Sequence, residues 1–564
     1  MVPFCASFVF TSLSSLVKPE QDKPIMKAAL LLTGLTGLAS ALPAADTSPP
    51  PAPLAARVPV PAADADPATL EDRALKVSVN LPYANIIGKD LFSVQTFNAI
   101  PYAEPPVGKL RLRPPKRLER DIGDVDARGI APACPQMYLT TENDNPFLDF
   151  IGDALTLPIF KAVNGQEDCL TVNVQRPSGT KEGDKLPVLF WIFGGGFQLG
   201  STGMYDASGL LKAGVNMKQP FIFVSVNYRV GGFGFLPGKE VLADGAANLG
   251  LLDQRMGLEW VADNIGAFGG DPEKVTIWGE SAGAISVMDQ MVLYGGNITY
   301  KGKDLFRGAI MNSGSVIPAE KVDCAKGQAV YDNVVKMAGC GGAKDTLECL
   351  READYKKLLQ ATNSAPGIFS YNSVALSYLP RPDGVVLTST PDQLVMRGEY
   401  ASVPFIIGDQ EDEGTLFALF QSNLTTTDKV VDYLSDIFFP QAGKKVLKGL
   451  VETYPSRAKY GSPFRTSVFN EIYPGFKRLA ALLGDIVFTL TRRVFLEMTS
   501  EVKPDVPSWV GSGVALIPPL ISTNKEIVIP VILQLWDPGN GNIPRQRPNP
   551  SVSATLIRNI LSRH

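Results

Sequence analysis

The segment Val275–Gly283, with the sequence VTIWGESAG, constrains the fold more than any other part of the chain. Val275–Trp278 is a short apolar run typical of a strand, and a helical pattern starts at Ala284. Between them lies a G-x-S-x-G turn, whose small residues allow a sharp strand-to-helix turn that exposes the Oγ of Ser281. The five-residue pattern is weak evidence alone, so the functional interpretation depends on what else the chain contains.

Apolar runs at intervals along the chain predict the rest of the sheet. Several of them are apolar throughout, which is typical of strands buried on both faces. Helical patterns such as Asp253–Ile265 lie between the runs. The sequence therefore predicts an α/β fold with a mostly parallel central sheet and helices on both faces. The expected strands are Lys76–Asn80, Leu91–Phe97, Leu170–Val174, Leu186–Phe193, Phe221–Asn227, Val275–Trp278, Phe306–Met311 and Val403–Gly408.

Composition excludes several classes of function. The 564 residues are 45% hydrophobic and 20% charged, as in an ordinary globular protein. A net charge of −4 without a basic stripe argues against a nucleic-acid partner. There is no P-loop, H-E-x-x-H or paired C-x-x-C motif, so phosphate-cradle and metal chemistry have no support.

The first part of the chain has the features of an export signal. A short basic start at Lys27, an apolar core and the Ala39-Ser40-Ala41 site predict a signal peptide that starts at Met26 and is cleaved before Leu42. Residues 1–25 fit no element, and a mis-assigned start codon would explain them. No other apolar run reaches transmembrane length, so we expect a secreted protein without a transmembrane segment.

Composition also divides the chain into four parts. Residues 42–74 are rich in proline and alanine and too poor in large apolar residues to pack, which predicts a linker. The folded domain is expected over residues 75–509. Residues 510–564 are atypical and include a stretch of disordered composition, so the expected order is 1–41 extension and signal, 42–74 linker, 75–509 domain and 510–564 disordered tail.

A glycine triplet provides a second candidate feature of an active site. Gly194-Gly195-Gly196 follows the apolar run that ends at Phe193. Glycines at a strand end let backbone N–H groups turn toward one point, as an oxyanion hole requires. A plain tight turn would be the better interpretation without Ser281, but the two features together favour the catalytic one.

Five longer motifs resemble the type-B carboxylesterase/lipase family of the α/β-hydrolase fold, and most of all its secreted fungal lipases. The resemblance runs from about Leu75 to Trp509. It implies a serine acyl-enzyme mechanism acting on acylglycerols, other lipid esters or small esters, with no metal or organic cofactor. The motifs are FGGGFQLGS, SVNYRVGGFGF, NLGLLDQRMGLEWVADNIGAFGGDPEKVTIWGESAG, GDQEDEGT and YGSPFRT.

The resemblance also assigns roles to residues of this chain. It implies Ser281 as nucleophile and the N–H groups of Gly195, Gly196 and Ala282 as the oxyanion hole. Of the four acids between 409 and 413, it selects Glu413 as the triad acid; from composition alone, a solvated acidic loop would be the better interpretation. Glu280, beside the nucleophile, is expected to make structural hydrogen bonds.

Six cysteines and two sequons complete the implied features. The resemblance implies disulfides Cys134–Cys169 and Cys340–Cys349, with Cys324 unpaired and Cys5 removed with the signal; spacing alone could not choose these pairs. Within the first loop, residues 145–156 have an amphipathic helical pattern that suits either core packing or a lipase lid. Asn297 and Asn423 stand in acceptable N-glycosylation sequons.

The catalytic base is missing from the expected place. The family pattern requires a histidine near residue 520, but the only histidine of the chain is His564. Neither His564 nor Lys525 is a convincing substitute. Either the coding sequence has been misread near Val510 through an intron or frame shift, or the protein is a non-catalytic hydrolase fold that binds lipid or a partner. The intact Ser281, glycines and Glu413 favour the first explanation.

Overall fold

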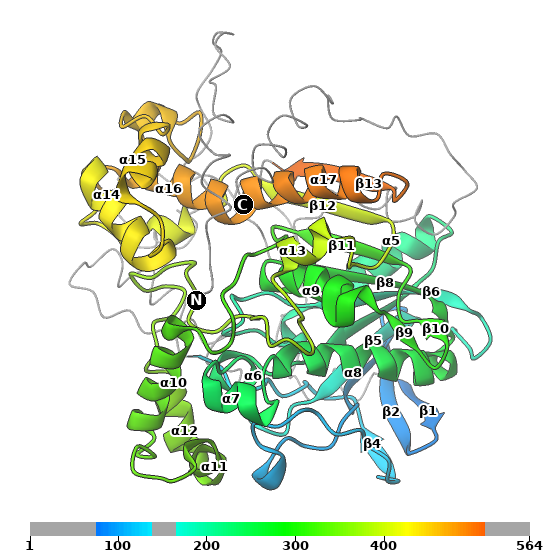
Figure 1. The fold of residues 1–564 in the computed structure, drawn as a ribbon. Coiled ribbons are helices and arrows are strands. Elements are labelled where there is room, and N and C mark those ends of the chain that lie inside the picture. The colour runs from blue at the N-terminus through cyan, green and yellow to red at the C-terminus, as the bar shows by residue number, and fades with distance from the viewer. Residues whose placement is uncertain (1–74, 138–164, 514–564) are drawn as a thin grey trace, which may run out of the picture. The chain divides into compact units, whose positions relative to one another are not determined.

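A large sheet is at the centre of the computed structural model, which describes residues 75–137 and 165–513. Figure 1 shows this sheet with helices packed around it. Ten of its strands form one path, and the short β4 (Asp124–Asp126) pairs with β2 beside that path. The order along the path is β1 (Leu75–Leu81), β2 (Ala84–Leu91), β3 (Val94–Pro101), β5 (Thr171–Pro177), β7 (Ile222–Val226), β6 (Leu186–Ile192), β8 (Gly270–Glu280), β11 (Gly308–Asn312), β12 (Phe405–Gln410) and β13 (Ser508–Gly513).

The sheet has an antiparallel part and a larger parallel part. From β1 to β7 each neighbour along the path is antiparallel. From β7 through β6, β8, β11 and β12 to β13 every pair is parallel. The carboxyl ends of β8, β11, β12 and β13 therefore lie side by side at one edge, which is where α/β proteins place their sites. The predicted mostly parallel sheet is confirmed.

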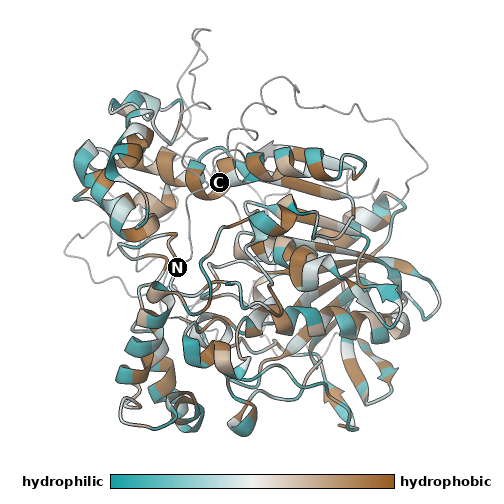
Figure 2. Ribbon diagram, viewed as in Figure 1, coloured by the Kyte–Doolittle hydropathy of each residue, from teal (hydrophilic) through white to brown (hydrophobic). Residues whose placement is uncertain are grey.

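Burial distinguishes the inner strands from the strand at the sheet edge. Every residue of β5 and β7 is buried, whereas β1 at the sheet edge alternates toward solvent. Figure 2 shows hydrophobic residues concentrated in the central strands, with hydrophilic residues on the outer parts of the helices. Strands covered on both faces favour apolar side chains, as in β6 and β7, although β5 also buries polar side chains such as Asn173 and Arg176.

One predicted strand is wrong. The run Leu91–Phe97 is divided by a turn at Phe92 and Ser93, whose φ angles are 52° and 68°. This two-residue turn joins β2 to β3 as an antiparallel hairpin. Such turns usually carry glycine or asparagine, and an apolar residue at Phe92 hid the boundary and also the strand β2.

The predicted end of the domain at residue 509 also differs from the structure. Strand β13 continues from Ser508 to Gly513 and pairs with β12 in parallel register, from Phe405↔Ser508 to Gln410↔Gly513. The first residues of the predicted tail are thus part of the sheet. The rest of the tail, the linker and the signal segment lie outside the described residues.

Helices pack on the sheet and also form a second, smaller core. The expected helix Asp253–Ile265 is observed as α8 (Leu249–Asn264), next to α9 (Ala282–Gly296), which contacts β8 and β11. Apolar side chains between Ala418 and Leu490 form the second core, on α14, α15 and α16. The other helices and short strands are α5 (Ser208–Asn216), α6 (Gly231–Gly234), α7 (Lys239–Asp244), α10 (Ala325–Met337), α11 (Thr346–Glu352), α12 (Tyr355–Thr362), α13 (Pro391–Met396), α14 (Thr427–Tyr433), α15 (Lys444–Glu452), α16 (Phe476–Gly484), α17 (Leu490–Val502), β9 (Thr299–Tyr300) and β10 (Lys303–Asp304).

The two disulfides pack in or against the main hydrophobic core and close loops of different length. The structure joins Cys134 to Cys169, 35 residues apart, and Cys340 to Cys349, 9 residues apart. These are the pairs that the resemblance implies. Cys324 forms no disulfide, and its Sγ accepts a hydrogen bond from the Gly327 N–H at the start of α10.

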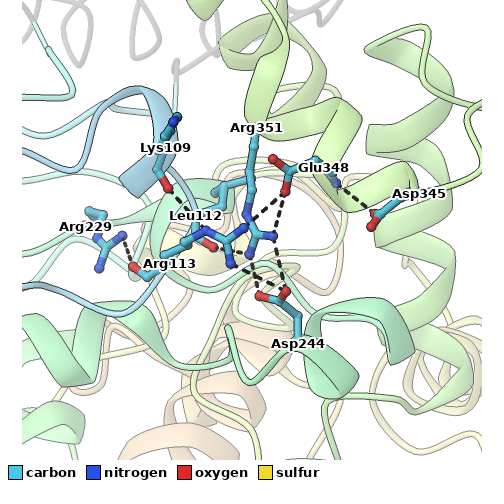
Figure 3. Close-up of polar contacts among 8 residues, drawn as sticks. All are labelled: Lys109, Leu112, Arg113, Arg229, Asp244, Asp345, Glu348 and Arg351. Carbon is cyan, nitrogen blue, oxygen red and sulfur yellow. Dashed lines mark hydrogen bonds and ion pairs between the residues drawn. The ribbon is translucent and has the colours of Figure 1, made fainter.

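A buried arginine ties α11 to α7 and to the loop before β4. The side chain of Arg351 is 4% exposed and pairs with Asp244 at the end of α7 and with Glu348. Its Nη2 also donates to the backbone oxygen of Leu112 at 3.0 Å. Arg113 reaches the same two carboxylates from the solvent side, as Figure 3 shows.

We expect Arg351→Met to lower the free energy of unfolding by about 2 kcal/mol, because it removes the contacts of the buried guanidinium with Asp244, Glu348 and the Leu112 oxygen. Arg113→Met is the matched control. Its side chain is 38% exposed, so its removal should cost less than about 1 kcal/mol. Urea denaturation of both variants makes the comparison, and equal losses would show that the buried arginine does not hold these elements together.

Candidate active site

Ser281 lies at the sharp turn between β8 and α9. Its backbone has φ 56° and ψ −124°, a strained conformation for a residue with a side chain. Its N–H donates to the Asn312 oxygen of β11 at 2.8 Å, and its carbonyl accepts from Ile285 in the first turn of α9. The turn is therefore fixed on both sides, and Ser281 lines a pocket at the carboxyl edge of the sheet.

Two glycines make this turn possible. A Cβ on Gly279 would lie 2.3 Å from the Gly283 carbonyl carbon, and a Cβ on Gly283 would lie 2.0 Å from the Ile192 oxygen of β6. Neither position can accept a side chain without moving backbone. The G-x-S-x-G pattern thus reflects close packing of strand, turn and helix, as the sequence predicts.

The glycine triplet after β6 lies against the nucleophile. A Cβ on Gly194 would come within 2.9 Å of the Ser281 Cβ and 2.7 Å of the Glu280 Oε2. Gly195 and Gly196 have φ angles of 109° and 61°. Gly196, Ser281 and Ala282 line the same pocket. The structure brings together the residues that the resemblance assigns to the nucleophile and the oxyanion hole.

Glu413 follows β12 and is connected to the nucleophile through β11. Its Oε1 accepts the Gln410 N–H at 2.7 Å, and its carboxylate also accepts a hydrogen bond from the Ser313 side chain. Burial raises the pKa of Glu413, while these hydrogen bonds act in the opposite direction. Ser313 directly follows Asn312, which accepts the Ser281 N–H. Ser313 is a site residue that the sequence reasoning missed, because no motif marks it.

The three competing acids of the loop are engaged elsewhere. Each has an ion-pair or hydrogen-bond partner of its own, whereas Glu413 accepts a hydrogen bond from Ser313. The contacts are Asp409 with Arg492 at 2.9 Å, Glu411 with Arg465, and Asp412 with the Ser462 Oγ at 2.7 Å and the Phe464 N–H at 2.9 Å.

Glu280 stands close to both Ser281 and Glu413. Burial, followed by the negative charge of Glu413, raises the pKa of Glu280 to about 7. Burial, followed by the negative charge of Glu280, raises the pKa of the nearby Tyr205 phenol above its usual value. The nucleophile therefore has two buried carboxyl groups nearby, of which only Glu413 is held by hydrogen bonds from neighbouring strand ends.

The pocket beside Ser281 is almost entirely apolar. It contains about 610 Å³ of space, part of it open to solvent. Its walls come from both the sheet core and the second core, where Phe417 stacks on Phe488. The described residues that line it are Gly196, Phe197, Ser281, Ala282, Ile285, Asp289, Ile317, Ile368, Val374, Leu376, Leu379, Pro380, Pro391, Phe417, Val487 and Phe488. Such a pocket suits an ester with a hydrophobic substituent.

The described part of the chain contains no histidine, since His564 follows it. His564, Lys525 and the predicted lid segment 145–156 all lie outside the described residues. The pairing of Gly513 with Gln410 nevertheless fixes where the chain leaves β13. Gln410 is the last residue of β12, and Glu413 follows it by three residues in the next loop. The chain therefore leaves β13 beside the loop that carries Glu413.

The remaining predicted sites can be placed. Asn297 and Asn423 are exposed, as modification requires. Across residues 75–137 and 165–513, no group of three or more histidine, cysteine or acidic residues could hold a metal ion. No helix within those same ranges is long and apolar enough to cross a membrane.

Comparison with known proteins agrees with this geometry. The model of the carboxylesterase family matches residues 76–496. The chain is 61% identical over 450 residues to "Secreted triacylglycerol lipase LIP1" of Gibberella zeae, covering 80% of this chain and 76% of that protein. It is also 61% identical over 444 residues to "Secreted lipase 1" of Botryotinia fuckeliana, covering 78% and 77%.

A solved structure supports the fold directly. The crystal structure of EstA from Aspergillus niger matches with a TM-score of 0.64 and 30% sequence identity, over 78% of this chain and 77% of that one. The predicted α/β-hydrolase fold is confirmed.

Proposed function

Because the chain belongs to the carboxylesterase family, we propose that it hydrolyses carboxylic esters of lipids by a serine acyl-enzyme mechanism. The observation that carries this proposal is the strained turn at Ser281, which faces an apolar pocket beside the glycine loop. Acylglycerols are the favoured substrate class, because relatives at 61% identity are named lipases. The same names give no support to the alternative of a non-catalytic hydrolase fold.

The chemistry follows from the positions of the residues. A base removes the proton of the Ser281 hydroxyl, and Oγ attacks the ester carbonyl. The N–H groups of Gly195, Gly196 and Ala282 stabilise the negative charge that develops on the carbonyl oxygen. The alcohol leaves, and water then releases the acid from the acyl-enzyme. Glu413 orients the base and stabilises its protonated form.

In the correctly read protein the base would be a histidine in the segment that follows β13. Gly513 pairs with Gln410, whose N–H donates to Glu413, so that segment would begin near the acid. The family match stops at residue 496, and the sequence beyond Gly513 supplies only His564. We attribute this to misreading of the coding sequence near Val510. Sequencing the transcript across the codon of Trp509 tests it: a reading frame without a nearby histidine would contradict this assignment.

The protein made from its own transcript should hydrolyse emulsified long-chain triacylglycerols faster than dissolved short-chain esters. The physical reason is the apolar pocket together with the proposed lid over residues 145–156, whose apolar face would open at a lipid–water interface. Titration of released acid against substrate concentration, below and above the solubility limit, measures the preference. Ser281→Ala controls for non-enzymatic hydrolysis. Equal rates on both substrates would indicate a plain esterase without interfacial preference.

The remaining assignments concern the mature protein. We propose secretion after cleavage near Leu42, a linker up to residue 74, and N-glycosylation at the exposed Asn297 and Asn423. The secreted lipases among the relatives support export. N-terminal sequencing and a mobility shift on deglycosylation are the direct measurements.

A further inference from the structure

The apolar pocket contains a second polar side chain, at a distance from Ser281. Of the described residues that line it, Ser281 and Asp289 alone carry a polar side chain. Asp289 is 1% exposed, and neither of its carboxyl oxygens has a hydrogen-bond partner among the described residues. Buried polar groups are almost always paired, so an unpartnered carboxyl in the wall of a binding pocket points to a ligand.

The helix geometry gives its distance from the reacting centre. Ala282, Ile285 and Asp289 all line the pocket, and their spacing of three and four residues places them on one face of α9. Seven residues of helix span roughly 10 Å at 1.5 Å per residue. The pocket therefore runs along α9 from the nucleophile to Asp289, with apolar walls between the two.

The protonation state of the Asp289 carboxyl group determines which kind of chemical group it can bind. Burial raises the pKa of Asp289 well above its ordinary value, which favours the neutral acid over the carboxylate. A neutral carboxylic acid both donates and accepts a hydrogen bond, and a hydroxyl group does the same. A cationic group would have to lose its hydration among apolar walls without a charged partner, which is costly.

We propose that Asp289 recognises a hydroxyl group on the hydrocarbon chain of the substrate, roughly 10 Å from the ester carbonyl along the axis of α9. The preferred substrates are then esters of fatty acids hydroxylated in mid-chain. This inference rests on the proposed function, because Ser281 must hold the ester end for the distance to apply.

The test measures binding rather than turnover. The full chain carrying Ser281→Ala is loaded with a fluorescent fatty acid, which is displaced by methyl stearate or by the positional isomers of methyl hydroxystearate. The mid-chain isomers should bind about tenfold more tightly than methyl stearate, the value of one good hydrogen bond. Isomers hydroxylated next to the ester carbonyl or at the far end should show no such gain.

Three variants in the same background locate the effect. Asp289→Leu should abolish the preference, while Asp289→Asn should keep most of it because the amide also donates and accepts. Ile285→Leu, one turn earlier on the same face, is the matched control and should change the affinity for all isomers alike. If Asp289→Leu does not fold, as judged by its thermal transition, the isomer series and Asp289→Asn still decide the matter.

Two results would overturn the inference: equal binding of all isomers, as when an ordered water alone satisfies Asp289, or a preference that survives Asp289→Leu. Hydrolysis of unsubstituted esters as fast as hydroxylated ones would also overturn the inference about Asp289, but it would agree with the proposed function. A hydroxyl preference in a protein that never hydrolyses esters would contradict the proposed function instead.

Discussion

The 564-residue chain should hydrolyse a chromogenic ester only about 10³–10⁴ times faster than water does, and a segment after Gly513 that supplies a histidine beside Glu413 should raise kcat by about 10⁶. The loss of the base removes about 8 kcal/mol of transition-state stabilisation through RT ln(10⁶). The oxyanion hole and the pocket account for the residual rate.

A chimera provides the measurement. Residues after Gly513 are replaced by the segment that follows the corresponding strand in one of the secreted lipases, and both proteins are assayed after their folding has been verified by circular dichroism. The control is the same chimera with its new histidine changed to alanine, which should return to the low rate. An ordinary enzymatic rate for the unaltered chain would show that another group serves as base, and His564→Ala and Lys525→Ala would be the next variants.

In the histidine-bearing protein, Ser281→Ala should lower kcat by about 10⁶ and Glu413→Gln by about 10⁴, because the nucleophile and base act as a unit while the acid only orients and stabilises the base. In the unaltered chain Ser281→Ala should change the residual rate little. A catalytic role of Ser281 predicts a large loss of kcat only in the histidine-bearing protein, whereas a structural role predicts a loss of rate in both proteins.

Glu411→Gln is the matched control for the acid. Glu411 lies two residues away in the same loop and pairs with Arg465 at the surface, so its loss should leave kcat nearly unchanged. Single-turnover kinetics on each variant measures the chemical step. An equal effect of Glu411→Gln and Glu413→Gln would contradict the assignment of the acid.

The sequence predicted the parts of the site that depend on local chain geometry. Gly279 is required by the close approach of Gly283 in the same turn and Gly283 by the end of β6, so the five-residue pattern together with the strand before it and the helix after it located Ser281. Glu413 needed the family resemblance, since four acids stand together in the loop and only their distant partners distinguish them. Ser313 and Asp289 could not be predicted, because their roles arise from neighbours on other strands and helices.

Some strands of the fold were also predicted from the sequence, and others were missed. Strands buried on both faces were predicted from their largely apolar runs, as for β6 and β7. The hairpin at Phe92 and Ser93 was missed because its positive φ angles are imposed by pairing of β2 with β3, not by glycine. Strand β13 was missed because its place is fixed by the register with β12 and not by its own composition.

The pocket is shared between two cores, and this has a consequence for how the protein loses activity. Ile285 packs against the sheet core, whereas Phe417 packs against the separate helical cluster and stacks on Phe488. Proteins open in cooperative units of unequal stability. Opening of the smaller helical unit would remove one wall of the binding site while the sheet remains folded. Ligand binding would then disappear at a lower urea concentration than the circular dichroism of the sheet, and a bound lipid would act as the clamp that holds the two units together.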